Sequence, residues 1–117
     1  MVTIKSYTTV EQSRKLAEIL PSESADMVIW GKDLDAIVAT DAQKLMSCLN
    51  MNYLPCWSLA ALINILPNAK LCHYDNSYFC QYMSRGDEFP KYSTMEYDNP
   101  IDACVAMIIK LHKLNLL

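Results

Sequence analysis

Residues 54–67 read "LPCWSLAALINILP", and they set the expected fold because two prolines bracket an apolar run. Pro55 suits the first turn of a helix, where its missing N–H costs no hydrogen bond, and Pro67 ends the segment. Apolar side chains lie on every side of a helix over residues 55–66. Such a helix is typical of one that several neighbours bury, so we expect it at the centre of the core.

The segment before this helix predicts one helix, one hairpin and a further short helix. Thr9 and Gln12 form a capping box, which predicts a helix that begins at residue 10 and ends before Pro21. "ADMVIW" (25–30) and "LDAIVAT" (34–40) are β-prone runs around the turn "GKD". A second capping-box pattern, followed by apolar residues at helical spacing, predicts a short helix over 41–49.

The segment after the central helix predicts a hairpin, a third strand and a final helix. Asp75, Asn76 and Ser77 form a turn cluster between two β-prone runs. "KYSTMEY" (91–97) is expected to add a strand to this hairpin. Asn99 as N-cap and Pro100 at the first helical position then predict a C-terminal helix.

These elements together predict the α+β class, in one domain over residues 1–117. The connections between strands are too short for crossovers, so the sheet should be mostly antiparallel. We expect about five strands in one sheet and about four helices, with helix 55–66 central.

Charge and hydropathy exclude some classes of function. The net charge is −3, and the ten Lys and Arg residues do not cluster, which argues against nucleic-acid binding. No apolar run approaches the roughly 18–20 residues that cross a bilayer, so we expect no membrane contact. The N-terminus lacks a basic start followed by an apolar stretch, so the expected location is the cytoplasm.

Cys56 is the first candidate for chemistry among the five cysteines. A nucleophilic cysteine needs a nearby base, and His73 and His112 are the two histidines of the chain. A small thiol enzyme or redox protein that uses Cys56 with His73 or His112 is therefore one hypothesis. A buried cysteine in a core helix is more common, so our main expectation is a protein that is not an enzyme and needs no cofactor.

Metal binding and a disulfide are the other possibilities for the cysteines. The adjacent Cys72 and His73 should point to opposite faces of a strand, and the chain has no paired Cys knuckle, so we expect no metal site. If the hairpin turn centres on Asn76, Cys72 and Cys80 lie opposite each other and could form a cross-strand bridge.

Tyrosines give the candidate binding surface. Strand alternation places Tyr74, Tyr78 and Tyr82 on one face of the expected hairpin. An uncovered tyrosine face offers a large contact area at a small entropic cost, which favours recognition of a protein partner. Alternatively, these rings pack at the sheet edge with their hydroxyls in water.

Three blocks, "TTVEQSRKLAEILPSESADM", "PCWSLAALINILP" and "NPIDACVAMIIKLHKLNLL", resemble a group of short proteins of uncharacterised activity. These are encoded mainly by phages, prophages and mobile elements of gut anaerobic bacteria. The resemblance implies a bacterial cytoplasmic protein, and a phage or mobile-element accessory factor that binds a host or phage protein. A homo-oligomer, with Met and Tyr side chains at its interface, is a further hypothesis.

Overall fold

Six β-strands form two antiparallel sheets in the computed structural model. The structure describes residues 6–30, 35–38, 53–84 and 86–117. The first sheet has the order β2-β1-β3 and the second has the order β4-β5-β6. The strands are β1 (Met27–Trp30), β2 (Asp35–Val38), β3 (Tyr53–Cys56), β4 (Ala69–Tyr74), β5 (Ser77–Tyr82) and β6 (Tyr92–Ser93).

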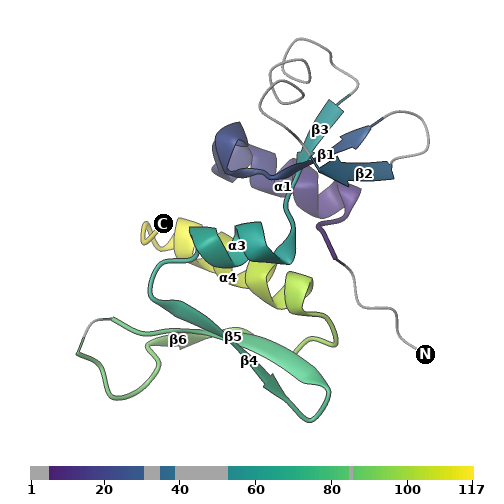
Figure 1. The fold of residues 1–117 in the computed structure, drawn as a ribbon. Coiled ribbons are helices and arrows are strands. Elements are labelled where there is room, and N and C mark those ends of the chain that lie inside the picture. The colour runs from purple at the N-terminus through teal and green to yellow at the C-terminus, as the bar shows by residue number, and fades with distance from the viewer. Residues whose placement is uncertain (1–5, 31–34, 39–52, 85) are drawn as a thin grey trace.

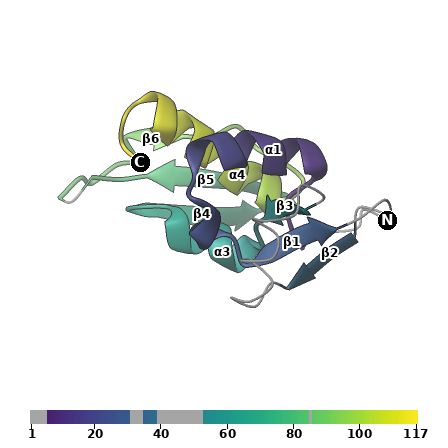
Figure 2. The same ribbon diagram turned by 90° about the horizontal axis from the view of Figure 1, so that it is seen from above.

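Helices α3 and α4 lie between the two sheets (Figure 1). α4 contacts α1, α3 and the second sheet, while α1 also packs on β3 of the first sheet. Figure 2 shows α1 and α4 beside each other when the molecule is viewed from above. The helices are α1 (Val10–Ile19), a 3-10 turn η1 (Ser22–Ser24), α3 (Leu59–Ile65) and α4 (Pro100–Lys113).

The α+β class agrees with the sequence, but the expected single sheet of five strands with four helices is wrong. β3 pairs with β1 and thereby belongs to the first sheet, and α3 follows it and separates it from the β4–β5 hairpin. The described residues therefore hold two three-stranded sheets and three α-helices. The helix expected over 41–49 lies outside the described residues.

The expected helix over 55–66 is also wrong at its start, because Pro55 and Cys56 belong to β3. They lie opposite Val28 and Met27 of β1. β3 is an edge strand, where a proline is tolerated because one side of the strand needs no N–H donor. The pairing with β1, which the local pattern does not reveal, thus overrides the helical preference of the proline.

Helix α3 begins after Ser58, and two contacts fix that position. The Ser58 hydroxyl accepts a hydrogen bond from the Ala61 N–H at 3.2 Å, so Ser58 is the N-cap. Asp26 holds Ser58 in turn: its carboxylate accepts the Ser58 N–H at 2.9 Å and also the Ser58 hydroxyl. The segment before β1 therefore decides where α3 starts.

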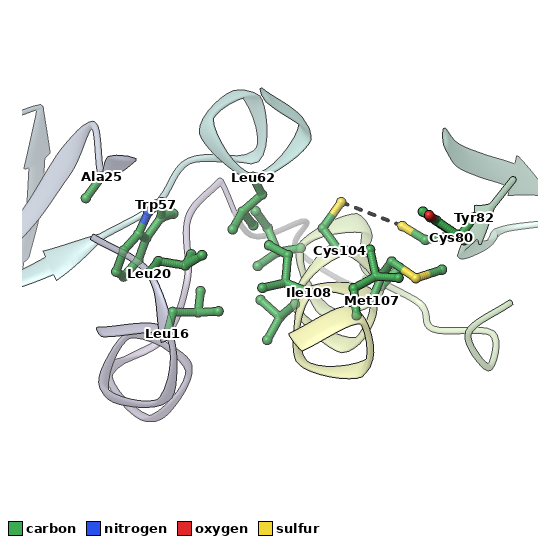
Figure 3. Close-up of a cluster of buried hydrophobic side chains, with 14 residues drawn as sticks. Leu16, Leu20, Ala25, Trp57, Leu62, Cys80, Tyr82, Cys104, Met107 and Ile108 are labelled. Carbon is green, nitrogen blue, oxygen red and sulfur yellow. Dashed lines mark hydrogen bonds between the residues drawn. The ribbon is translucent and has the colours of Figure 1, made fainter. Parts of the chain in front are cut away.

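The centre of the core is α4 and not the segment 55–66. Leu62 is the buried residue of α3, and Ile63 on its other side is 47% exposed. α4 is covered by α1, α3 and β5, so it buries side chains around most of its circumference (Figure 3). Its buried residues are Pro100, Ile101, Ala103, Cys104, Val105, Met107, Ile108 and Leu111.

Two local predictions are confirmed at the helix starts. Thr9 and Gln12 form the expected capping box of α1, with reciprocal bonds of 3.1 and 3.0 Å. At α4 the Asn99 side chain accepts from the Ile101 N–H at 2.8 Å, and Pro100 occupies the first turn. Gln12 also donates to the Asp102 carboxylate at 2.7 Å, which joins α1 to the first turn of α4.

Candidate functional site

The β4–β5 hairpin, which carries the predicted tyrosines, closes with a two-residue turn. Asp75 and Asn76 have φ of 51° and 63°, and Tyr74 pairs with Ser77. Both φ values are positive, as a type I′ turn requires, and Asp and Asn are among the residues that tolerate this region. The hairpin prediction is confirmed, but its centre lies between Asp75 and Asn76 and not on Asn76.

This register separates the three tyrosines. Residues that pair across two strands share one face, and alternate residues along a strand share it too. Tyr78 and Tyr82 therefore lie with Leu71 on the face toward α4, where Tyr82 is only 7% exposed. Tyr74 lies on the opposite face and is 74% exposed. The expected single face of Tyr74, Tyr78 and Tyr82 is wrong.

The inward tyrosines help to attach the sheet to α4. The rings of Tyr82 and Tyr92 lie 5.9 Å apart, and the Lys110 ammonium of α4 lies 5.6 Å from the Tyr92 ring centroid. Tyr78 stacks on His73 with ring centroids 4.3 Å apart and planes within 6°. These contacts give Tyr78 and Tyr82 a role in packing.

The other side of the β4–β5 hairpin, which we name the outer face, points away from α4. No described element covers it, as Figure 1 shows below the second sheet. Tyr74 is its most exposed aromatic side chain, and Phe79 beside it is half-buried. The outer face consists of Lys70, Cys72, Tyr74, Ser77, Phe79 and Gln81.

Cys56 lies in a closed polar cluster at the other end of the molecule. It is fully buried, donates to the Thr8 carbonyl at 3.5 Å and accepts from the Thr8 hydroxyl at 3.5 Å. The Thr8 hydroxyl also lies 2.7 Å from that of Ser13, and burial raises the pKa of the Cys56 thiol. A buried thiol that resists ionisation is the opposite of an activated nucleophile.

Neither histidine is a partner of Cys56. His73 is stacked on Tyr78 in the second sheet, and His112 is exposed near the C-terminal end of α4. The structure therefore does not bring together the residues of the predicted thiol site. Sequence reasoning missed Thr8 and Ser13, whose burial depends on the N-terminal segment pairing with Trp57.

Cys80 and Cys104 form a second buried cysteine contact, which the sequence did not reveal. Their sulfur atoms are 3.9 Å apart, between β5 and α4 (Figure 3). The hydrogen bond to Cys104 and burial raise the pKa of Cys80. The predicted position of Cys72 opposite Cys80 is wrong, because the register pairs Cys72 with Phe79 and places the two cysteines on opposite faces.

Within the described parts of the chain, no three His, Cys, Asp or Glu side chains gather closely enough to hold a metal ion. No helix in those parts has the length and hydropathy to span a bilayer. No protein-family model matches the chain, and no curated protein and no solved structure matches it.

Proposed function

We propose that this chain is a non-enzymatic binding protein that recognises another protein through the outer face. The observation that carries the proposal is Tyr74, 74% exposed on a sheet face that no described element covers. A tyrosine ring buries a large area on binding, loses few rotamers and keeps a hydroxyl for a hydrogen bond. It is therefore suited to anchor a protein partner.

The position of Tyr74 supports this role. It ends β4 directly before the tight turn, so its backbone is fixed by the pairing with Ser77. A fixed backbone reduces the conformational entropy that binding must remove. Phe79 and the stem of Lys70 extend the contact area along the same face, and Lys70 adds a positive charge for an acidic group of the partner.

The biological setting is part of the proposal. The resemblance to phage and mobile-element proteins supports a cytoplasmic accessory factor that acts on a host or phage protein in a bacterium. The environment of Cys56 does not favour the thiol-enzyme alternative, since Cys56 is buried, burial raises its pKa, and neither His73 nor His112 contacts it.

A pull-down with a matched pair of variants tests the outer face. Tyr74→Ala removes the proposed anchor, and Ile63→Ala removes an exposed apolar side chain from α3 instead. From a lysate of a gut anaerobe, we expect Ile63→Ala to recover the same partner as the wild type. Tyr74→Ala should recover at least tenfold less, since anchor tyrosines cost about 2 kcal/mol or more on truncation. Equal recovery by Tyr74→Ala would remove the outer face from consideration.

A further inference from the structure

Strand β4 is an edge strand with hydrogen-bonding groups that face outward. It is the terminal strand of the order β4-β5-β6. On β5, the backbone groups of Tyr78, Cys80 and Tyr82 bond toward β6 and the residues on either side of it, to Tyr97, Thr94 and Lys91. Residues opposite each other in an antiparallel pair direct their backbone groups either toward each other or both outward. The residues opposite these three, His73, Leu71 and Ala69, therefore direct their N–H and C=O groups away from β5.

This edge has little of the protection that natural edge strands carry. Six consecutive residues pair with β5 without a bulge, and β4 contains no proline. Lys70 is its one charged residue, and the Lys70 side chain lies on the outer face and not in the plane of the edge. These outward donors and acceptors have no backbone partner among the described residues, and at strand spacing they fit one kind of ligand, another extended strand.

We infer that the strand added at this edge is β4 of a second copy of the chain, antiparallel to the first and related to it by a two-fold axis at Leu71. In this register Leu71 lies opposite its own equivalent, and Ala69 lies opposite His73 of the second copy. Each of these pairs exchanges two hydrogen bonds, so every outward N–H and C=O of the three residues is bonded. The β4-β5-β6 sheets of the two copies thereby become one continuous sheet.

Charge and geometry select this register over its two neighbours. An axis at Lys70 would place the two ammonium groups directly opposite each other, which is destabilising. An axis at Cys72 would place Ala69 opposite the turn residue Asp75, whose φ of 51° is not that of a strand. With the axis at Leu71, Lys70 lies opposite the uncharged Cys72. Tyr74 lies beyond the paired residues, so this inference does not depend on the proposed function.

A crosslink tests the register. Lys70→Cys introduces a thiol opposite the native Cys72 of the second copy, at about 4.5 Å between Cα atoms. A mild thiol oxidant such as diamide should then give a covalent dimer, with position 70 joined to Cys72 in the peptide map. The two native Cys72 residues are diagonal neighbours about 7–8 Å apart, beyond the reach of a disulfide. A dimer of the wild type joined through Cys72 would overturn the register.

The molecular mass of the protein in solution tests whether the dimer forms. His73→Pro removes one outward N–H and leaves the β4–β5 ladder intact, whereas the control His73→Ala keeps that N–H. By light scattering we expect dimers for the wild type, His73→Ala and Tyr74→Ala, and a folded monomer for His73→Pro. Survival of the dimer in His73→Pro would overturn the inference.

Amide hydrogen exchange tests the same dimer on the wild-type protein, so this test does not depend on whether a variant folds. As protein concentration rises, the amides of Ala69, Leu71 and His73 should become as protected as those of Lys70 and Cys72. A monomer at all concentrations, with these three amides still exchanging rapidly, would overturn the inference and leave the edge to a strand of another protein. That outcome would not affect the partner recognition tested with Tyr74→Ala.

Discussion

The sulfur atom of Cys104 on α4 lies 3.9 Å from that of Cys80 on β5, and both side chains are fully buried. This contact joins the central helix to the middle strand of the second sheet. Each thiol behaves mainly as a small apolar group with a weak S–H donor, so the pair fills the space between helix and sheet at little polar cost.

Replacing one of these thiols with a hydroxyl should destabilise the fold. Cys104→Ser puts a more strongly polar group into the same apolar site, and we expect a loss of about 1–3 kcal/mol of unfolding free energy. Urea unfolding with an unchanged m-value measures the loss. Cys72→Ser on the outer face is the control and should stay within about 0.5 kcal/mol of the wild type. Equal effects of the two variants would contradict the burial of Cys104.

Thiol labelling should separate the described cysteines into two groups. Cys72 is partly exposed, whereas Cys56, Cys80 and Cys104 are buried. We expect Cys72 to react with a maleimide on the folded protein and the other three to react only after denaturation, with each site assigned by mass spectrometry. Rapid labelling of Cys56 in the folded state would contradict the closed cluster with Thr8 and support the thiol-enzyme hypothesis again.

Stability should fall at alkaline pH because of the buried thiols. Burial raises the pKa of Cys56, and its contact with Cys104 together with burial raises the pKa of Cys80. Above the ordinary thiol value of about 8.5, the unfolded chain loses these protons while the folded chain keeps them. The folded state then binds more protons, so its stability decreases as pH rises.

The measurement is the melting temperature from pH 7.5 to 10.5 for the wild type and Cys56→Ala. The stabilisation from a neutral Cys56 is complete below pH 8 and decreases above it. We expect the wild type to lose more between these limits than the variant loses, because the variant has one buried thiol fewer. Parallel curves for the two proteins would mean that Cys56 has the same pKa in both states.

The cap of α3 should also contribute measurably to stability. Ser58→Ala removes the acceptor for the Ala61 N–H and a donor to the Asp26 carboxylate. We expect a loss of about 1–2 kcal/mol by chemical denaturation, as for other N-cap residues. Ser22→Ala, at an exposed serine of η1, is the matched control and should be near neutral. If Ser58→Ala left the free energy of unfolding unchanged, Asp26 and Ser58 would not fix the helix start.

Local signals predicted the local features of this fold. The capping box at Thr9, the Asn99-Pro100 helix start and the hairpin turn near Asn76 each depend on residues a few positions apart, and each is present. Pro55 led to a wrong prediction of the helix start, because a proline suits both the first turn of a helix and an edge strand. Only the pairing of β3 with β1, more than twenty residues away, decides between the two.

The predicted tyrosine face failed because the pairing of β4 with β5 differs by one residue from the predicted pairing. A turn centred on Asn76 would have kept the three tyrosines together, but the two-residue turn moves Tyr74 to the opposite face from Tyr78 and Tyr82. The contact between Cys80 and Cys104 depends on how α4 docks on β5, which no local pattern specifies. Helical and strand spacing could place each cysteine on a buried face, but could not bring the two together.

The bond from Gln12 to Asp102 at 2.7 Å joins residues 90 positions apart. Leu16 of α1 is fully buried in the hydrophobic cluster, to which α4 contributes half of the buried side chains. During synthesis, α1 leaves the ribosome long before α4 exists, so the part of its apolar stripe that packs on α4 has no site to occupy at that stage. The nascent chain therefore carries this part of the stripe exposed until α4 has been translated, with β3 as the only earlier element of the described chain that makes extensive contact with α1.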